Sequence, residues 1–410
     1  MTQDAFQHRF ANGLTLLAEP MPHVRSAAMY FLVPAGCAND PTDRPGLAGI
    51  VAGMMTRGAG SRDNRALMLA QDNLGLDRSE SVGVAHMRFW GGTVAKNLPP
   101  AMDIFADVLL RPHFPEEELE PIQALAVQDL KGLEDEPSSL LMLELRKRLY
   151  PSPLCNDHRG TIEGVEAVTL AEVKAYHKRH FGPAGAIVSV AGNIDWPKIR
   201  DQVERLFGDW KGSEPTPSTL GPEPTGHSHL TKELEQTHIA LAYPSVPVDH
   251  PDYYQALGAV NILSGGMGAR LFTELREKEG LCYSVSASYM PMKDRGSIMG
   301  YVASDKPQRA LDKLIEELCR LPQGITQEEV DRVKVGLKTS LIMRQESTSS
   351  RALSLASDWY YLGRVQSFDE IQSRIDGLTT KSILDHLRKT PPRDFRVVTI
   401  GPEALNTGAV

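Results

Sequence analysis

Apolar residues recur along this chain at helical spacing in several places. Positions 47, 50, 51 and 54 are all apolar, as on one face of a helix. We expect that helix to begin at Pro45, because proline suits the first turn. Thr169, with Glu172 three residues later, predicts a capping box that opens a helix through His180. Two amphipathic helices are predicted at 99–110 and 115–133, and a third long helix at 139–149.

Shorter apolar runs predict strands between these helices. The segments 10–20 and 26–34 read as strands, and the polar bend between them suggests an antiparallel hairpin. Residues 83–96 suggest another strand or pair of strands. The run 186–192 is typical of a short buried strand.

A proline-rich segment separates two similar halves of the chain. Residues 212–226 hold four prolines and no hydrophobic periodicity, so we expect an exposed linker. Beyond it the pattern restarts, since a strand at 237–243 and a helix at 252–263 follow the order of the strand at 26–34 and the Pro45 helix. We infer an α+β fold of two homologous domains, 1–211 and 227–410, each a mainly antiparallel sheet covered by helices. Further segments correspond in pairs, 93–103 with 301–312 and 114–118 with 325–329.

Composition narrows the class of protein. The chain has 410 residues and a net charge of −8, without a basic stripe, which disfavours nucleic-acid binding. No apolar run approaches the ~18 residues of a membrane span. The first residues lack the basic and apolar regions of a signal peptide, so we expect a cytoplasmic protein, although a periplasmic mature form would look the same. The four cysteines show no CxxC spacing, so neither disulfides nor a cysteine zinc site is indicated.

The stretch 263–285, LSGGMGARLFTELREKEGLCYSV, carries the most chemistry. It begins with a glycine-rich loop at 264–268 and continues as a helix, for which Gly280 is the expected left-handed cap. Alternation at 281–285 predicts a strand. A reversal after Gly280 would bring Arg276 and Tyr283 together as a pair of donors suited to a carbonyl or oxyanion. The alternative is that Arg276 pairs with Glu274 or Glu279 while Tyr283 fills the core.

This stretch resembles the pitrilysin/insulinase family of zinc peptidases, in particular the small-subunit branch that includes mitochondrial processing peptidase. The family pattern LF..LRE..GL.YSV after a glycine-rich loop is matched here residue for residue. The resemblance implies roles in substrate binding and carbonyl stabilisation for Arg276 and Tyr283. It also implies that Gly265, Gly266 and Gly268 contact substrate, and that the duplicated fold forms half of a clam-like chamber that holds peptides.

The zinc motif of that family is missing from this chain. The family's H-x-x-E-H aligns with Gly49-Ile-Val-Ala-Gly53, so Gly49 and Gly53 replace the two histidines and Ala52 replaces the glutamate. The family's third ligand aligns with Asp129. Seven positions earlier, where the family usually has an acidic residue, this chain has Ile122. Catalytic zinc needs about three protein ligands, so we expect no metal in this chain.

Other histidines do not restore a site. His177 and His180 lie one helical turn apart, and His227 and His229 sit at the edge of the linker, but neither pair has a third ligand nearby in sequence. We therefore expect none of them to bind metal.

The leading functional hypothesis is the non-zinc subunit of a two-chain zinc peptidase. A homologous partner would carry H-x-x-E-H and the zinc, and this chain would add Arg276, Tyr283 and the glycine-rich loop. One alternative is a proteolytically inactive structural subunit, like the core subunits of respiratory complexes. Another is an independent peptide-binding homodimer, in which the glycines at 49 and 53 simply allow close packing.

Overall fold

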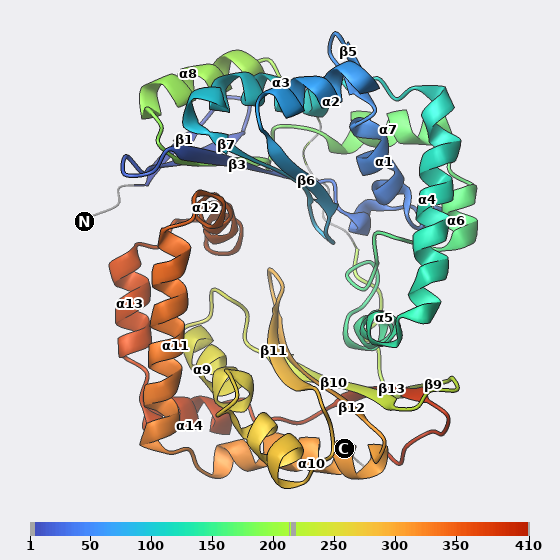
Figure 1. Ribbon diagram of the computed structural model, residues 1–410, viewed down its shortest axis with the longest axis vertical. Helices are drawn as coiled ribbons and strands as arrows, with labels where there is room; N and C mark the ends of the chain where they lie inside the picture. Colours follow the sequence, from blue (N-terminus) through green and yellow to red (C-terminus); the bar gives the residue numbers. More distant parts are fainter. Residues whose placement is uncertain (1–4, 213, 215–218, 409–410) are drawn as a thin grey trace. The chain divides into compact units, whose positions relative to one another are not determined.

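The computed structural model describes residues 5–212, 214 and 219–408, which form two compact units (Figure 1). The first unit comprises the chain up to Gly132, Ser152–Gly221 and Arg344–Trp359; the second comprises Leu133–Pro151, Pro222–Met343 and the chain from Tyr360 onward. The change from Gly221 to Pro222 falls within the expected linker, of which residues 213 and 215–218 lie outside the described part. Each unit also includes one segment from the other half of the sequence.

A six-stranded sheet forms the centre of the first unit, in the order β1-β2-β8-β3-β7-β6. Only β2 and β8 pair in parallel. β3 is buried along nearly its whole length, because strands flank it on both edges and side chains cover both its faces. The strands are β1 (Phe6–Arg9), β2 (Thr15–Pro20), β3 (Ser26–Val33), β6 (Asp77–Val82), β7 (Met87–Val94) and β8 (Ile187–Gly192), with a separate small pair β4 (Gly58–Ala59) and β5 (Arg62–Asp63).

The helices of the first unit other than α12 bury their apolar faces in one core with this sheet. The predicted capping box is present at α7, where Thr169 and Glu172 bond each other's backbone N–H groups. The helices are α1 (Leu47–Met55), α2 (Asn64–Asn73), α3 (Leu98–Leu110), α4 (Leu119–Gly132), α6 (Ile162–Glu166), α7 (Leu170–His180), α8 (Trp196–Phe207) and most of α12 (Thr348–Leu362).

The second unit repeats this topology with five strands, in the order β11-β12-β10-β13-β9. Its parallel pair, β13 with β9, stands where β8 and β2 stand in the first sheet. The prediction of two homologous α+β domains is thus confirmed. The strands are β9 (Ser228–Thr231), β10 (Thr237–Ser245), β11 (Val285–Pro291), β12 (Gly296–Ser304) and β13 (Arg396–Gly401).

Helices cover both faces of the second sheet. Alternate residues of β10 point to opposite sides: Ile239 and Leu241 enter the main core, whereas Ala240 and Ala242 pack with α5. The helices are α5 (Pro137–Leu149), α9 (Tyr253–Ser264), α10 (Pro307–Arg320), α11 (Gln327–Gln345), α13 (Phe368–Asp376) and α14 (Thr380–Lys389).

α5 and α12 occupy equivalent places in the two halves of the sequence. Each packs in the unit that is formed mainly by the other half. Each follows the long helix of its own half, α4 or α11, yet α5 packs on β10 and β13, and α12 packs in the first unit. There the guanidinium of Arg351 meets the carboxylate of Glu19, with N–O distances from 2.5 to 3.1 Å, and Ser189 donates to the Ala352 carbonyl at 2.6 Å. Arg351 and Glu19 are both buried, so this ion pair fixes the position of α12 in the first unit.

Two predictions for the first unit differ from the structure. The strands at 15–20 and 26–33 do not pair as a hairpin, because β8 lies between them and bonds to both. The helix expected from Pro45 begins at Leu47, because Gly46 adopts a φ of 102° that breaks the helical path. No helix within 5–212, 214 and 219–408 is long and apolar enough to cross a membrane.

Candidate functional site

The glycine-rich loop follows α9 in the second unit. Gly265 ends the helix, and a Cβ there would lie 2.5 Å from the Asn261 carbonyl oxygen. Gly266 has a φ of +151°, which side chains rarely tolerate, and faces open space. Met267 is 76% exposed. The loop, whose residues 265–268 are all exposed, therefore presents its backbone to solvent.

Arg270 fixes the far end of this loop. Its guanidinium lies 2.6 Å from a carboxylate oxygen of Glu329 at the start of α11, and both side chains are largely buried. Arg270 also donates to the Gly324 carbonyl at 2.7 Å. Because partly buried, bidentate pairs hold their geometry well, the loop is anchored at both ends.

A π-helix, η5 (Phe272–Lys278), carries Arg276. Leu275 is buried on its inner face, and the N–H of Leu281 donates to the Leu275 carbonyl at 2.9 Å across the turn. Gly280 has a φ of 59°, as a left-handed helix cap requires. The predicted helix and cap are thus confirmed.

The strand expected at 281–285 is wrong for its first four residues. β11 begins only at Val285, and Leu281 is buried whereas Tyr283 is 77% exposed. The turn at Gly280 leads into an irregular segment, to which Arg276 bonds directly: its Nη1 donates to the Tyr283 carbonyl at 2.9 Å. This bond holds residue 283 out of the sheet.

Arg276 and Tyr283 lie in contact. The Cζ atom of Arg276 is 4.4 Å from the centre of the Tyr283 ring, within the range of a cation–π contact. It is also 4.7 Å from the centre of the Phe272 ring, one helical turn earlier. The sequence placed Phe272 on the same helix face as Leu271 and Leu275 and predicted no contact with Arg276, although four residues is a spacing at which helical side chains meet.

The acidic neighbours of Arg276 pair with other cations. Glu274 accepts a bond from Lys278 at 2.8 Å, which lowers the pKa of Glu274, and Glu279 is held by Arg309 at 2.9 Å. Arg276 takes part in no ion pair among the described residues, and its only protein acceptor there is the Tyr283 carbonyl. The alternative pairing of Arg276 with Glu274 or Glu279 is therefore not present.

Cys282 lies between these residues but is not poised as a nucleophile. Burial raises the pKa of its thiol, and the nearby Arg276 offsets this only in part. Because the thiolate is the reactive form, the site contains polar donors rather than an attacking group. Such an arrangement can bind and polarise a carbonyl.

The helix aligned with the zinc motif is α1. Its first turn is capped by Asp40, whose carboxylate accepts from the N–H groups of Gly46 at 2.9 Å and Ala48 at 2.8 Å. Burial raises the pKa of Asp40 to about 7, although these two bonds oppose the shift. Asp40 thus supports the helix rather than a metal.

The space that zinc ligands would need at α1 is filled by the chain itself. A Cβ on Gly49 would lie 2.6 Å from the His158 carbonyl oxygen, and one on Gly53 would lie 3.2 Å from Ile122 Cγ2. Ala52 is buried and Asp129 is exposed on α4. Across the described ranges, no three His, Cys, Asp or Glu side chains are grouped so as to hold a metal ion. These residues do not fit a zinc site.

The four histidines at 177, 180, 227 and 229 have structural partners. His177 is bonded to the Leu109 carbonyl at 2.9 Å and stacks on Phe181, and burial lowers its pKa. His180 packs on Tyr176, and burial lowers the pKa of His180 to about 4. His227 accepts from the N–H of Val397, and His229 bonds the Thr399 hydroxyl.

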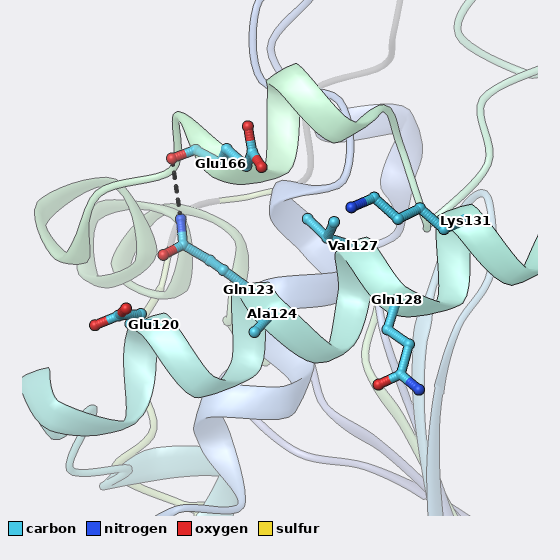
Figure 2. A pocket seen from close by; sticks show the side chains of 7 residues that line it. All are labelled: Glu120, Gln123, Ala124, Val127, Gln128, Lys131 and Glu166. Carbon is cyan, nitrogen blue, oxygen red and sulfur yellow. Dashed lines mark hydrogen bonds between the residues drawn. The ribbon is translucent and has the colours of Figure 1, made fainter.

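An open hollow of about 540 Å³ lies beside α4 and α6 in the first unit (Figure 2). Gln123 closes one end of it by donating to the Glu166 carbonyl at 3.3 Å. Its two carboxylates, on Glu120 and Glu166, belong to exposed residues. None of the sequence-predicted site residues lines it; the lining residues are Glu120, Gln123, Ala124, Val127, Gln128, Lys131 and Glu166.

Two family models match different parts of this chain. A family model described as "Insulinase (Peptidase family M16)" matches residues 15–158, and one described as "Peptidase M16 inactive domain" matches residues 167–337. The glycine-rich loop, Arg276 and Tyr283 all lie in the second match.

Similar proteins extend the likeness over nearly the whole chain. An "uncharacterized zinc protease" of Bacillus subtilis is 26% identical over 95% of this chain and 97% of its own length. A protein of the same description from Rickettsia bellii is 25% identical over 97% of this chain and 98% of its own length. The crystal structure of a peptidase M16 inactive domain from Pseudomonas fluorescens superposes with a TM-score of 0.91 at 23% identity, covering 99% of this chain and 100% of that one. The chain therefore belongs to the insulinase family of peptidases, M16.

Proposed function

We propose that this chain is the non-zinc subunit of a two-chain zinc peptidase. A homologous partner carrying H-x-x-E-H would hold the metal, and this chain would contribute Arg276, Tyr283 and the backbone of Gly265, Gly266 and Gly268. Arg276 and the Tyr283 hydroxyl would donate to the carbonyl of a peptide bond under attack, since fixed donors at a developing oxyanion lower the barrier to hydrolysis.

The observation that carries this proposal is that Arg276 contacts two aromatic rings and pairs with neither of its acidic neighbours, Glu274 and Glu279. Its guanidinium is held by two aromatic rings and one backbone carbonyl, while Glu274 and Glu279 are engaged by other cations. A purely structural arginine on a helix would be expected to pair with a carboxylate one turn away. Donors that remain unpaired beside an exposed phenol suit a transient ligand.

The filled α1 helix supports the division of labour between two subunits. Because Gly49 and Gly53 supply no ligand and lie against His158 and Ile122, hydrolysis would need a zinc site from elsewhere. The exposed backbone of the glycine-rich loop suits an extended peptide, which can pair its own N–H and C=O groups with it.

The test is hydrolysis of a quenched fluorescent peptide. The purified chain, a homologue that carries H-x-x-E-H, and their mixture are each assayed with and without 1,10-phenanthroline. We expect chelator-sensitive hydrolysis to depend on the mixture. Comparable chelator-sensitive activity from this chain alone would contradict the proposal.

Substitutions in the mixture test the residues. Arg276→Ala and Tyr283→Phe should each lower kcat by roughly 10²- to 10³-fold, as loss of an oxyanion donor typically does, without changing assembly in sedimentation. Arg388→Ala is the matched control, because among the described residues the side chain of Arg388 pairs only with Asp385, at the surface. If neither site variant altered turnover while the mixture stayed active, a structural subunit would be the better assignment.

A further inference from the structure

Phe272 is the second aromatic ring in contact with the Arg276 guanidinium. The Cζ atom of Arg276 lies 4.7 Å from the centre of the Phe272 ring and 4.4 Å from that of Tyr283. Both distances are within the ~6 Å at which a ring face attracts a cation. The two rings therefore hold one charge.

The inner face of the same helical segment does not depend on Phe272. Leu271 and Leu275 are both fully buried and join the core of the second unit. Phe272 is only half-buried and is not among the side chains packed against that core. The helix is thus anchored by its leucines, and the Phe272 ring is available for another purpose.

An arginine side chain left to itself would occupy many rotamers. Here no carboxylate restrains Arg276 among the described residues, since Glu274 and Glu279 are paired with Lys278 and Arg309. The restraint comes from the two rings and from the bond to the Tyr283 carbonyl. Rings restrain a guanidinium through its faces and leave the N–H groups at its edge free to donate.

We propose that Phe272 is a positioning residue, whose ring holds the Arg276 guanidinium in the orientation that binds a peptide carbonyl. This inference rests on the proposed function, because that function gives Arg276 its ligand. Phe272 itself touches no substrate. It acts through Arg276 alone, and this distinguishes it from a residue that merely stabilises the helix.

A double-mutant cycle in the two-subunit mixture tests the proposal. Phe272→Leu should lower kcat/KM by about 2- to 30-fold, the range that exposed to desolvated cation–π contacts span. In an Arg276→Ala background the same change should have no further effect. The separate variant Phe272→Tyr keeps an aromatic ring and should retain most of the wild-type activity. Phe6→Leu is the matched control, since exposed Phe6 stacks on Trp196 in the first unit.

A second measurement needs no activity. In an NMR spectrum of arginine-labelled chain, the Arg276 side-chain resonances should carry a ring-current shift that Phe272→Leu reduces and Phe272→Tyr retains. An equal loss of kcat/KM in both backgrounds, or an unchanged Arg276 shift, would overturn the inference. If Arg276→Ala itself had no effect on turnover while the NMR shift responded as expected, the proposed function would fail and the positioning contact would stand.

Discussion

The two glycines of α1 decide at the scale of single residues whether this chain can be given a zinc site. The variant Gly49→His/Ala52→Glu/Gly53→His would write the family motif into the sequence. A Cβ at position 49 meets the His158 carbonyl oxygen at 2.6 Å, and Ala52 is 5% exposed. We expect the variant to lose at least ~1–3 kcal/mol of stability by overpacking, with more lost by burying a carboxylate, and to bind no zinc.

Thermal unfolding and elemental analysis after dialysis measure both outcomes. Gly132→His is the matched control, because nothing lies within 4 Å of a Cβ at position 132, so its unfolding temperature should change little. One tightly bound zinc per chain, together with an unchanged or higher unfolding temperature, would show that the space at α1 can be reopened.

Asp40 gives stability a pH dependence of predictable sign. Burial raises its folded pKa to about 7 from the ordinary value of 3.8, so the folded state holds the proton more tightly than the unfolded state. The stabilising contribution of the protonated group is therefore complete below pH ~4 and is lost as the pH rises to ~7. Relative to Asp40→Asn, the wild-type unfolding temperature should fall between pH 4.5 and pH 7.5. If the difference in unfolding temperature between the wild type and Asp40→Asn did not vary with pH, this prediction would be contradicted.

Sequence reasoning succeeded for residues whose role follows from local spacing. Gly280, Thr169 and Glu172 sit in caps, where three or four neighbours determine the backbone. The partners of Gly49 could not be found in this way, because His158 and Ile122 approach it or its helix from distant parts of the chain. Tyr283 was misplaced in a strand because alternation alone does not reveal a bond from Arg276 to its carbonyl.

At the scale of elements, α10 keeps the helix that carries Arg276 free of competing charge. Arg309 holds the Glu279 carboxylate through two bonds of 2.9 Å, and Lys313 lies 3.6 Å from it. In Arg309→Gln, Glu279 would lose its main partner and could pair with Arg276, three residues earlier on the same helix. We expect KM for the peptide to rise about 1.4- to 5-fold, in line with the ~0.2–1 kcal/mol of an exposed ion pair.

The suppressor of this effect is Glu279→Gln in the same chain. Removing the carboxylate removes the competitor, so the double variant should regain the KM of the wild type. Steady-state kinetics of the mixture with the zinc-bearing homologue measure both variants. If the double variant were as impaired as Arg309→Gln alone, α10 would act on the helix in some way other than through Glu279.

Element prediction failed where pairing partners are far apart in sequence. The polar strand β6, DRSESV, went unrecognised because it is an edge strand with exposed alternate residues. The expected hairpin failed because β8, more than 150 residues later than β3, inserts between β2 and β3. The duplication itself was predictable, since the same order of strand, helix and strand recurs in each half.

At the scale of the whole molecule, the exchange of α5 and α12 makes each unit depend on both halves of the sequence. α5 buries Leu141 and Leu145 in the second unit, and α12 contributes Arg351 and Leu355 to the first. Each buried leucine contributes roughly 1.5–3 kcal/mol, and removing Arg351 would leave Glu19 as a buried, unpaired charge, which typically costs ~3–5 kcal/mol.

Separately produced fragments 1–221 and 222–410 should therefore each unfold at low denaturant and bind a hydrophobic dye. Mixing them should restore one cooperative transition. As a control, the full chain with a protease site placed in the linker and cleaved after folding should keep both halves together in gel filtration, because each half already holds a helix from the other. Two stable, independently folded fragments would show that the exchanged helices are dispensable.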